Sequence, residues 1–304
     1  MKIKVIINPK SKNGDRKTLK AILDEKFTHF LSGIECTAYP GQATHMARQG
    51  TGENVDTVVV VGGDGTINEV VNGIIGTEMK LGIIPTGAAN DLATLYHIPN
   101  NVAEACDVIL EHHLSCIDLI CVNGRYYATA GGMGLPCEVV RLANNIKLKS
   151  PMGRLFSQFL GRRIYLFAVL RALIKKGEQG HLVNIRWEDF SLTMDSLALM
   201  VDNQPFLGRD FLMSPGAING DGLLDICLIK NLKSLIQTLF ILLKVRNGSH
   251  IHLPSVIRWQ ARELSIQTKK SLPFFGDGEV FGQGSEFRIK IIPKALKIIA
   301  PRIK

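Results

Sequence analysis

Apolar residues in the first 120 positions follow two alternating patterns. Nearly continuous apolar runs predict strands at residues 2–9, 34–38, 56–65 and 80–87, the last two ending in glycine turns. Helical spacing predicts helices at 16–30, 44–49 and 67–75. Buried strands that alternate with helices are typical of a parallel sheet with helices on both faces. The sequence therefore predicts an α/β N-terminal domain.

The pattern changes after residue 123, where short apolar runs are separated by Gly, Pro, Asn and Asp. Regular short strands favour a mainly antiparallel β-sandwich or a barrel. Within this half, helical spacing predicts helices at Met152–Lys176 and Leu235–Lys244. We place the domain boundary at Asn123-Gly124. This gives an α/β domain over residues 1–123 and a β-sandwich C-terminal domain over 124–287, with about 288–304 as a segment that could return to the first domain.

A glycine turn with one aspartate follows the most apolar strand, in the sequence VVVVGGDGTINEVVN at residues 58–72. Glycines leave room for a ligand beside the backbone, and the N–H groups of a following helix attract phosphate. Thr66 is expected to cap that helix, with Glu69 completing a capping box. Asp64 places a carboxylate where the metal of a nucleotide could bind. The turn therefore predicts a phosphate site.

Two other phosphate motifs do not fit this turn. No glycine of the chain is followed by Lys and Ser or Thr at the spacing of a Walker loop. The dinucleotide fingerprint G-x-G-x-x-G fails because Asn68 stands at the third glycine. Asp64 would also repel a bare pyrophosphate. Both observations weaken an NAD-binding interpretation.

The charge balance is the unusual part of the composition. The chain has 304 residues, 46% of them hydrophobic, and a net charge of +9. That length can hold two cores, and the charge suits an anionic partner such as a nucleotide, nucleic acid or acidic membrane surface. No aromatic-plus-basic motif or recognition helix supports nucleic-acid binding.

Cysteine usage and hydropathy indicate a cytoplasmic protein. The six cysteines form no C-x-x-C pair, and the N-terminal sequence predicts a strand rather than a leader. No apolar run reaches the ~18 residues of a spanning helix. Residues 147–176 carry eight basic residues among apolar ones. They fit a helix at an anionic membrane surface as well as a core helix with a charged face, and both alternatives stay open.

Seven motifs, taken in order, resemble those of the diacylglycerol kinase catalytic-domain family, in its soluble bacterial lipid kinase branch related to sphingosine kinases. They are NPKS at 8–11, GGDGTINEVVNG at 62–73, GIIPTGAANDLA at 82–93, IDLICVNG at 117–124, AGGMG at 130–134, PGAINGDGLLD at 215–225 and DGE at 277–279. The resemblance implies an ATP- and Mg²⁺-dependent kinase that phosphorylates a hydroxyl of a membrane lipid such as diacylglycerol. It also implies transient contact with the inner face of the membrane.

The resemblance also implies roles for individual residues. Asp64, Asp91 and Asp118 match acidic positions of the family's active site, Asp64 being the one that works with catalytic Mg²⁺. The ATP site would comprise Asn8, Pro9, Lys10, Ser11, Lys12, Thr44, Gly63, Asp64, Gly65, Thr66, Ile67, Asn68, Glu69, Ala88 and Asp91. A second, structural Mg²⁺ site would comprise the carbonyls of Ile218 and Leu223 with Asp221, and Asp118 is a further candidate metal ligand.

The acceptor end of the site is expected at Asp277 and Glu279. A positioned carboxylate can take the proton of a lipid hydroxyl, and the family assigns this role to the position of Glu279. Because Gly276 and Gly278 predict a turn, the sequence leaves open which carboxylate reaches the hydroxyl. Ala88 replaces the usual threonine of the family, which predicts weaker ATP binding. An NAD kinase and a non-catalytic nucleotide- or lipid-binding protein remain alternatives.

Overall fold

The computed structural model describes residues 1–10, 16–148, 171, 180–208, 210–232 and 234–302. The chain forms two compact units. The first comprises Met1–Leu119, Tyr126–Ala128 and Ile292–Lys304, and the second Ile120–Arg125 and Thr129–Ile291. A two-domain architecture, α/β at the N-terminus and β-rich at the C-terminus, is confirmed.

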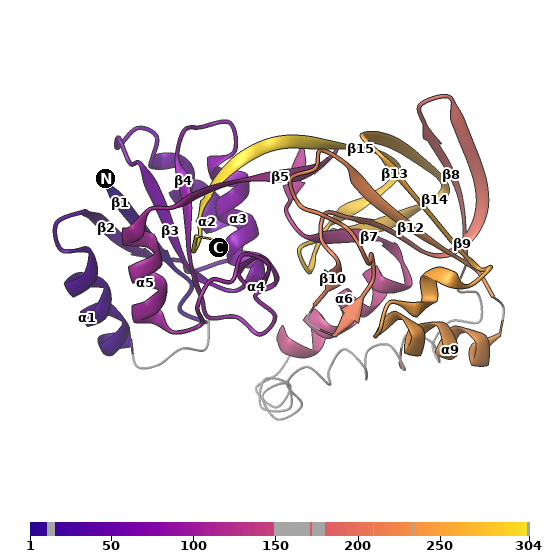
Figure 1. Cartoon of the computed structure of the whole chain (residues 1–304), viewed down its shortest axis with the longest axis horizontal. Helices are drawn as coiled ribbons and strands as arrows, with labels where there is room; N and C mark the ends of the chain where they lie inside the picture. Colours follow the sequence, from indigo (N-terminus) through magenta and orange to yellow (C-terminus); the bar gives the residue numbers. More distant parts are fainter. Residues whose placement is uncertain (11–15, 149–170, 172–179, 209, 233, 303–304) are drawn as a thin grey trace. The chain divides into compact units, whose positions relative to one another are not determined.

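Parallel strands form the centre of the first unit (Figure 1). The strand order is β4-β3-β1-β2. The strands are β1 (Ile3–Ile7), β2 (Leu31–Cys36), β3 (Thr57–Gly62) and β4 (Lys80–Pro85). Every residue of β1 and β3 is buried, which is the burial expected of strands covered on both faces.

Helices lie on both faces of this sheet, with α1 beside α5 and α2 beside α3 (Figure 1). They are α1 (Arg16–Phe27), α2 (Gln42–Gln49), α3 (Asp64–Ile74), the short α4 (Asp91–Leu95) and α5 (Val102–Glu111). Asn101 caps α5 by accepting hydrogen bonds from the N–H groups of Ala103 (2.9 Å) and Glu104 (3.2 Å).

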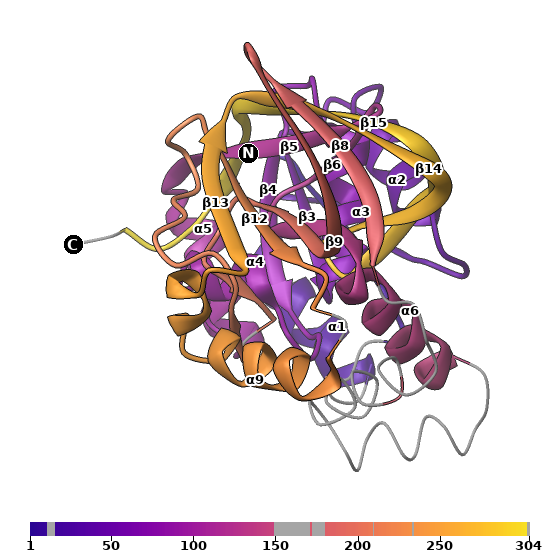
Figure 2. The same ribbon diagram turned by 90° about the vertical axis from the view of Figure 1, so that its right-hand side faces the viewer.

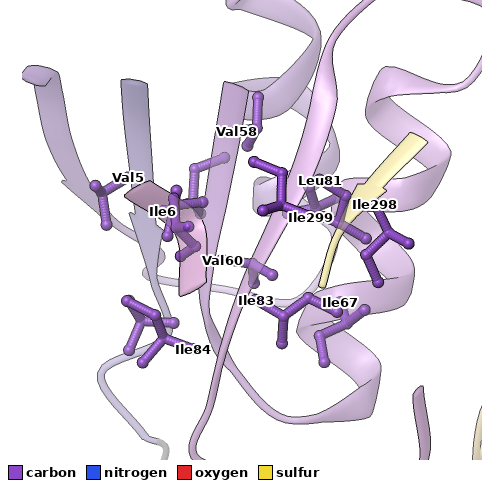
Figure 3. Packing of buried hydrophobic residues seen from close by; sticks show 14 of the residues in the cluster. Val5, Ile6, Val58, Val60, Ile67, Leu81, Ile83, Ile84, Ile298 and Ile299 are labelled. Atoms are coloured by element: carbon purple, nitrogen blue, oxygen red, sulfur yellow. The ribbon is translucent and has the colours of Figure 1, made fainter. Parts of the chain in front are cut away.

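The C-terminal end of the chain belongs to the first unit. The last residues of β15 (Glu279–Ile299) pair in parallel with β4, Lys297 opposite Lys80 and Ile298 opposite Leu81. Figure 3 shows Ile298 and Ile299 in the same apolar core as Leu81. The first domain is therefore completed by residues more than 200 positions beyond β4.

The second unit consists mainly of antiparallel strands. They are β7 (Ala130–Gly134), β8 (His181–Trp187), β9 (Phe190–Asp202), β12 (Leu224–Lys230), β13 (Val256–Ala261) and β14 (Glu263–Gly276), together with β15. Strand β9 pairs with β7, β7 with β14, β14 with β8, and β8 again with β9. These four strands therefore close into a ring.

The remaining elements are short strands and two helices of the second half. Strands β5 (Leu114–Val122), β6 (Arg125–Tyr127), β10 (Phe206–Leu207) and β11 (Phe211–Leu212) add short pairings. Helices α6 (Leu135–Leu148) and α9 (Leu235–Val245) share an apolar cluster with β9 and β12, and a 3-10 turn at Ser249–His252 follows α9.

The structure differs from the predicted elements at several places. The short apolar runs at 191–194 and 196–201, which Asp195 separates, belong to one strand, β9. Helices α4, α5 and α6 were not predicted. Helix Met152–Lys176 lies almost wholly outside the described residues, as does most of the basic stretch 147–176. By contrast, α9 begins at the predicted residue and ends one residue later.

Candidate active site

Helix α3 begins closer to the end of β3 than the predicted capping box at Thr66 and Glu69 requires. Helix α3 starts at Asp64 with Gly63 as its N-terminal cap, and no side chain in the described part of the chain caps it. Thr66 lies inside the helix, where its hydroxyl accepts a hydrogen bond from Asn8 Nδ2 at 2.8 Å. The prediction that Thr66 caps α3 is therefore wrong, because the glycine turn admits Asp64 to the first helical position.

Glu69 stabilises a different helix from the one predicted. Its carboxylate accepts the N–H groups of Gly41 (2.7 Å) and Ala43 (3.0 Å), at the start of α2. The Thr44 hydroxyl donates to the Glu69 carbonyl at 2.9 Å. A carboxylate at a helix N-terminus pairs with unsatisfied donors and the positive end of the dipole. Thr44 and Glu69 are thus joined, although they are 25 residues apart.

Two glycines bring the loops after β3 and β4 into backbone contact. A Cβ placed on Gly87 would lie 2.5 Å from the Gly63 Cα and 2.6 Å from Asn90 Oδ1. A Cβ on Gly63 would lie 3.0 Å from the Gly87 Cα. No other residue type fits Gly87 without displacing the backbone. The loops at the carboxyl ends of two neighbouring parallel strands, where α/β proteins bind ligands, are therefore held together.

Asp64 connects these loops. Its Oδ2 accepts the Asn90 N–H at 3.0 Å and its Oδ1 accepts the Asp91 N–H at 2.7 Å. Asn90 has a left-handed backbone, with φ of 53°, and its own side chain accepts the Gly87 N–H at 2.8 Å instead of capping α4. The carboxylate of Asp64 thus caps α4 from the first turn of α3 and is fixed in place.

The structure gathers most other predicted nucleotide residues in the same unit. Lys10 donates its N–H to Asn8 Oδ1 at 3.0 Å, and Asn68 Nδ2 donates to the Tyr126 carbonyl at 2.9 Å. Ala88 is exposed in the loop after β4, and Pro9 is half-buried. Ser11 and Lys12 lie outside the described residues.

Asp118 is held inside the first unit. It is fully buried on β5, and its Oδ1 accepts the N–H of Lys294 at 2.6 Å. Burial raises the pKa of Tyr96 to about 12, and the nearby Asp118 carboxylate contributes to this rise. The returning C-terminal strand therefore helps to position Asp118.

In the second unit, Asp277 and Gly278 form the two-residue turn between β14 and β15. Their φ angles are 49° and 76°, as the hairpin turn favoured for Asp-Gly requires. Asp277 Oδ1 accepts the N–H of Thr129 at 2.9 Å and its hydroxyl at 2.6 Å. Glu279 opens β15 opposite Gly276 and is half-exposed. The carboxylate of Asp277 is therefore anchored, while Glu279 is accessible to solvent.

The predicted structural metal site is a glycine-containing loop. Asp221 is exposed and its Oδ1 accepts the Leu223 N–H at 2.9 Å, while Gly220 and Gly222 have positive φ. Backbone carbonyls and one carboxylate form an oxygen donor set that suits Mg²⁺, which keeps several waters. Among the described residues, no three or more His, Cys, Asp or Glu side chains cluster as a metal site. Ile218 and Leu223 could contribute only carbonyls.

Sequence reasoning missed Thr129 and Asp202. Thr129 anchors Asp277, as described above. Asp202 on β9 lies opposite Ala130 on one side and, on the other, opposite Asp225, the last residue of the motif at 215–225. Both carboxylates are buried, Asp202 completely. Because β9 and β12 contain continuous buried runs, only the strand register shows that Asp202 and Asp225 are neighbours.

Burial raises the pKa of Asp202 to about 8, with Asp225 raising it further and the Ser214 hydroxyl and Gly131 backbone opposing the rise. The Ser214 hydroxyl donates to Asp202 Oδ2 at 2.6 Å, whereas Asp202 Oδ1 and Asp225 Oδ2 have no hydrogen-bond partner among the described residues. Desolvation also raises the pKa of Asp225. We therefore expect Asp202 to be protonated at neutral pH.

This protonation makes stability depend on pH. The folded chain binds a proton at Asp202 between the unfolded pKa near 4 and the folded pKa of about 8, and unfolding releases it. The free energy of unfolding should therefore fall as pH rises from 6 to 8, by up to about 1.4 kcal/mol per pH unit. Asp202→Asn should flatten this slope in urea titrations, whereas exposed Asp189→Asn should keep it. An unchanged slope in Asp202→Asn would disprove the assignment.

Fold and site together define a two-domain protein, with an α/β unit that holds Asp64 between two loops and a β-rich unit that carries an acidic hairpin. The diacylglycerol kinase catalytic domain matches residues 2–122, and the YegS C-terminal NAD kinase beta sandwich-like domain matches residues 132–300. The chain belongs to the diacylglycerol kinase family, in its bacterial branch.

Named relatives agree with this placement. A diacylglycerol kinase of Staphylococcus aureus (strain bovine RF122 / ET3-1) is 30% identical over 92% of this chain and 86% of its own length. The enzyme of that name from Staphylococcus carnosus (strain TM300) is 28% identical over 92% and 89%. A Bacillus anthracis (strain Sterne) crystal structure, provisionally described as a diacylglycerol kinase, has a TM-score of 0.79 at 25% identity, covering 99% of this chain and 97% of that one.

Proposed function

We propose that the protein is an ATP- and Mg²⁺-dependent lipid kinase, which transfers the γ-phosphate to a hydroxyl of a membrane lipid such as diacylglycerol. The observation that carries the proposal is the Asp64 carboxylate, fixed by two backbone N–H groups where the loops after β3 and β4 touch. Phosphoryl transfer depends mainly on positioning and on neutralising charge. The fixed carboxylate would hold the Mg²⁺ that neutralises phosphate charge, and the helix N-terminus beside it would position the phosphates.

The phosphates would bind at the start of α3, where Gly63 and Gly65 present no side chain. The helix N-terminus offers unsatisfied N–H groups and the positive end of the dipole. Asp64 and Asp91 would hold Mg²⁺, with Asp118 as a further candidate ligand. When bound, the cation neutralises charge on the phosphate oxygens.

The second unit would supply the acceptor end. Thr129 fixes the Asp277 carboxylate, which would orient the lipid hydroxyl. The accessible Glu279 would accept the hydroxyl proton. Asp221, with the carbonyls of Ile218 and Leu223, would hold a second cation that stabilises its loop.

One assay tests this proposal against its alternatives. Labelled ATP and Mg²⁺ are incubated with the protein and either diacylglycerol in mixed micelles or NAD. We expect label in the organic-extractable product. Label on NAD would instead identify an NAD kinase. If neither acceptor is labelled, phosphatidylglycerol, a sphingoid base and a polyprenol are tested in turn, and absence of transfer to all of them would favour a non-catalytic binding protein.

Removing the Thr129 hydroxyl should slow this reaction. Thr129→Val keeps the shape and the backbone N–H but deletes the 2.6 Å hydrogen bond to Asp277. Losing a hydrogen bond to a charged group should lower kcat about tenfold or more, with little change in the KM for ATP. Thr129→Ser should retain most of the rate. A Thr129→Val enzyme with wild-type kcat would show that the hydroxyl does not position Asp277 for transfer.

A further inference from the structure

Helix α9 has two apolar faces, and only one of them packs against the protein. Thr238, Ile241 and Val245 are buried, and Ile241 and Val245 belong to the apolar cluster shared with β9 and β12. On the other side Ile236, Phe240 and Leu243 are 80%, 50% and 67% exposed. The spacing i, i+4 and i+7 places these three side chains in one stripe, which we call the outer stripe.

The outer stripe is unusual for this chain. Twelve large apolar side chains are exposed among the described residues, and four of them, those of the stripe and Leu235, belong to this 11-residue helix. Single exposed apolar residues need no explanation, but a contiguous apolar patch marks an interaction site. Figure 2 shows α9 at the margin of its own unit, below β12 and β13.

The sequence around α9 is strongly basic. Residues 226–262 contain none of the chain's 27 acidic residues but six of its 36 lysines and arginines. The Lys244 ammonium lies 5.5 Å from the Phe240 ring centroid, directly beside the outer stripe. Arg246, immediately after the helix, is exposed. The nearby acid Asp195 binds Asn231 at 2.8 Å, before the helix begins.

We propose that α9 is a docking helix for an anionic lipid bilayer. Its outer stripe inserts at the boundary between the headgroups and the acyl chains, while Lys244 and Arg246 contact anionic headgroups. An interfacial helix binds through its buried apolar area and through attraction to anionic lipid. At 11 residues it is about 16 Å long, too short to span a bilayer. No helix in the described part of the chain meets the length and hydropathy of a membrane span.

Charge favours lipid over a second copy of this chain. A symmetric dimer through α9 would place the same surface on both partners. Lys244 and Arg246 would then face the basic residues of the identical segment. An anionic bilayer provides acyl chains for the outer stripe and negative headgroups for Lys244 and Arg246. The inference deepens the proposed function, since a lipid kinase must meet its substrate at a membrane.

Vesicle sedimentation tests the docking. The full chain is mixed with vesicles of phosphatidylcholine alone or with one third phosphatidylglycerol. The triple variant Ile236→Gln, Phe240→Gln, Leu243→Gln should bind the mixed vesicles about a hundredfold more weakly than the wild type, because three apolar insertions are lost. The control is Leu182→Gln with Phe190→Gln, which changes exposed apolar residues of β8 and β9 and should bind like the wild type.

A charge variant covers the case in which the triple variant does not fold. Lys244→Glu should weaken binding to the phosphatidylglycerol vesicles about tenfold and leave binding to phosphatidylcholine unchanged. Wild-type binding by the triple variant or by Lys244→Glu would overturn the proposal. An equal loss of vesicle binding in the Leu182 and Phe190 control would also overturn it. So would a triple variant whose vesicle binding is unchanged but which sediments as a monomer where the wild type sediments as a dimer.

Kinase assays separate this inference from the proposed function. On a short-chain, water-soluble diacylglycerol the triple variant should match the wild type, and on vesicles it should be slower. If the wild type transfers no phosphate to either substrate, the proposed function fails, while the vesicle-binding result still decides whether α9 docks.

Discussion

Asp64→Asn is expected to lower phosphate transfer by roughly three orders of magnitude, because it would weaken the binding of the Mg²⁺ that neutralises charge on the phosphoryl transition state. Asn keeps the shape and one acceptor oxygen but loses the negative charge. Both Asp64 oxygens accept backbone N–H groups, so the charge is held in one place rather than on a mobile side chain. The measurement is kcat with labelled ATP, together with the affinity for ATP with and without Mg²⁺.

The effect of Asp64→Asn on folding stability must be separated from its effect on kcat. Asp64 also caps α4, and losing a cap destabilises a protein by about 1 kcal/mol. Asn101→Ala provides a matched control, because Asn101 caps α5 in the same unit with two hydrogen bonds of similar length. Both variants should lose similar stability in urea, but Asn101→Ala should keep its kcat. Comparable activity of Asp64→Asn and Asn101→Ala would refute the metal role of Asp64.

Glu279→Gln is expected to have the second large effect, a loss of about 10²–10⁴-fold in kcat, which is the usual contribution of a general base. The geometry favours Glu279 over Asp277 for this role. Asp277 Oδ1 is engaged by the N–H and the hydroxyl of Thr129, whereas Glu279 follows the turn and is half-exposed. The measurement is kcat with labelled ATP and diacylglycerol.

Two further variants make this prediction specific. Asp277→Asn should lower kcat less than Glu279→Gln, since orientation of the hydroxyl is impaired and the base remains. Glu286→Gln changes an exposed carboxylate on the same strand and should behave as the wild type. If Asp277→Asn rather than Glu279→Gln has the larger loss of kcat, the two roles are exchanged.

Local patterns were sufficient for most elements of the first unit. The run of valines in β3, its glycine turn and the start of α3 follow from burial and from backbone freedom within ten neighbouring residues. Likewise, α9 was predicted within one residue because its apolar residues recur at helical spacing. By contrast, α5 was missed.

Hydrogen-bond partners at the site were not predictable in the same way. A capping box at Thr66 and Glu69 has the right spacing, but Glu69 binds the N-terminus of α2 and Asp64 caps α4. In both cases the N–H groups that the carboxylate accepts belong to another loop at the same edge of the sheet. A capping pattern shows that a carboxylate can accept N–H groups, and it does not show which helix lies within reach.

The sequence by itself determined the order of most elements of the first unit, the glycine turn after β3 and the family, because each of these depends on neighbouring residues. Only the tertiary structure decided that the last strand returns to β4, that Thr129 holds Asp277, and that Asp202 lies beside Asp225. These contacts join residues tens to hundreds of positions apart. These contacts depend on strand register and on where the chain returns to an earlier strand, and local residue spacing fixes neither.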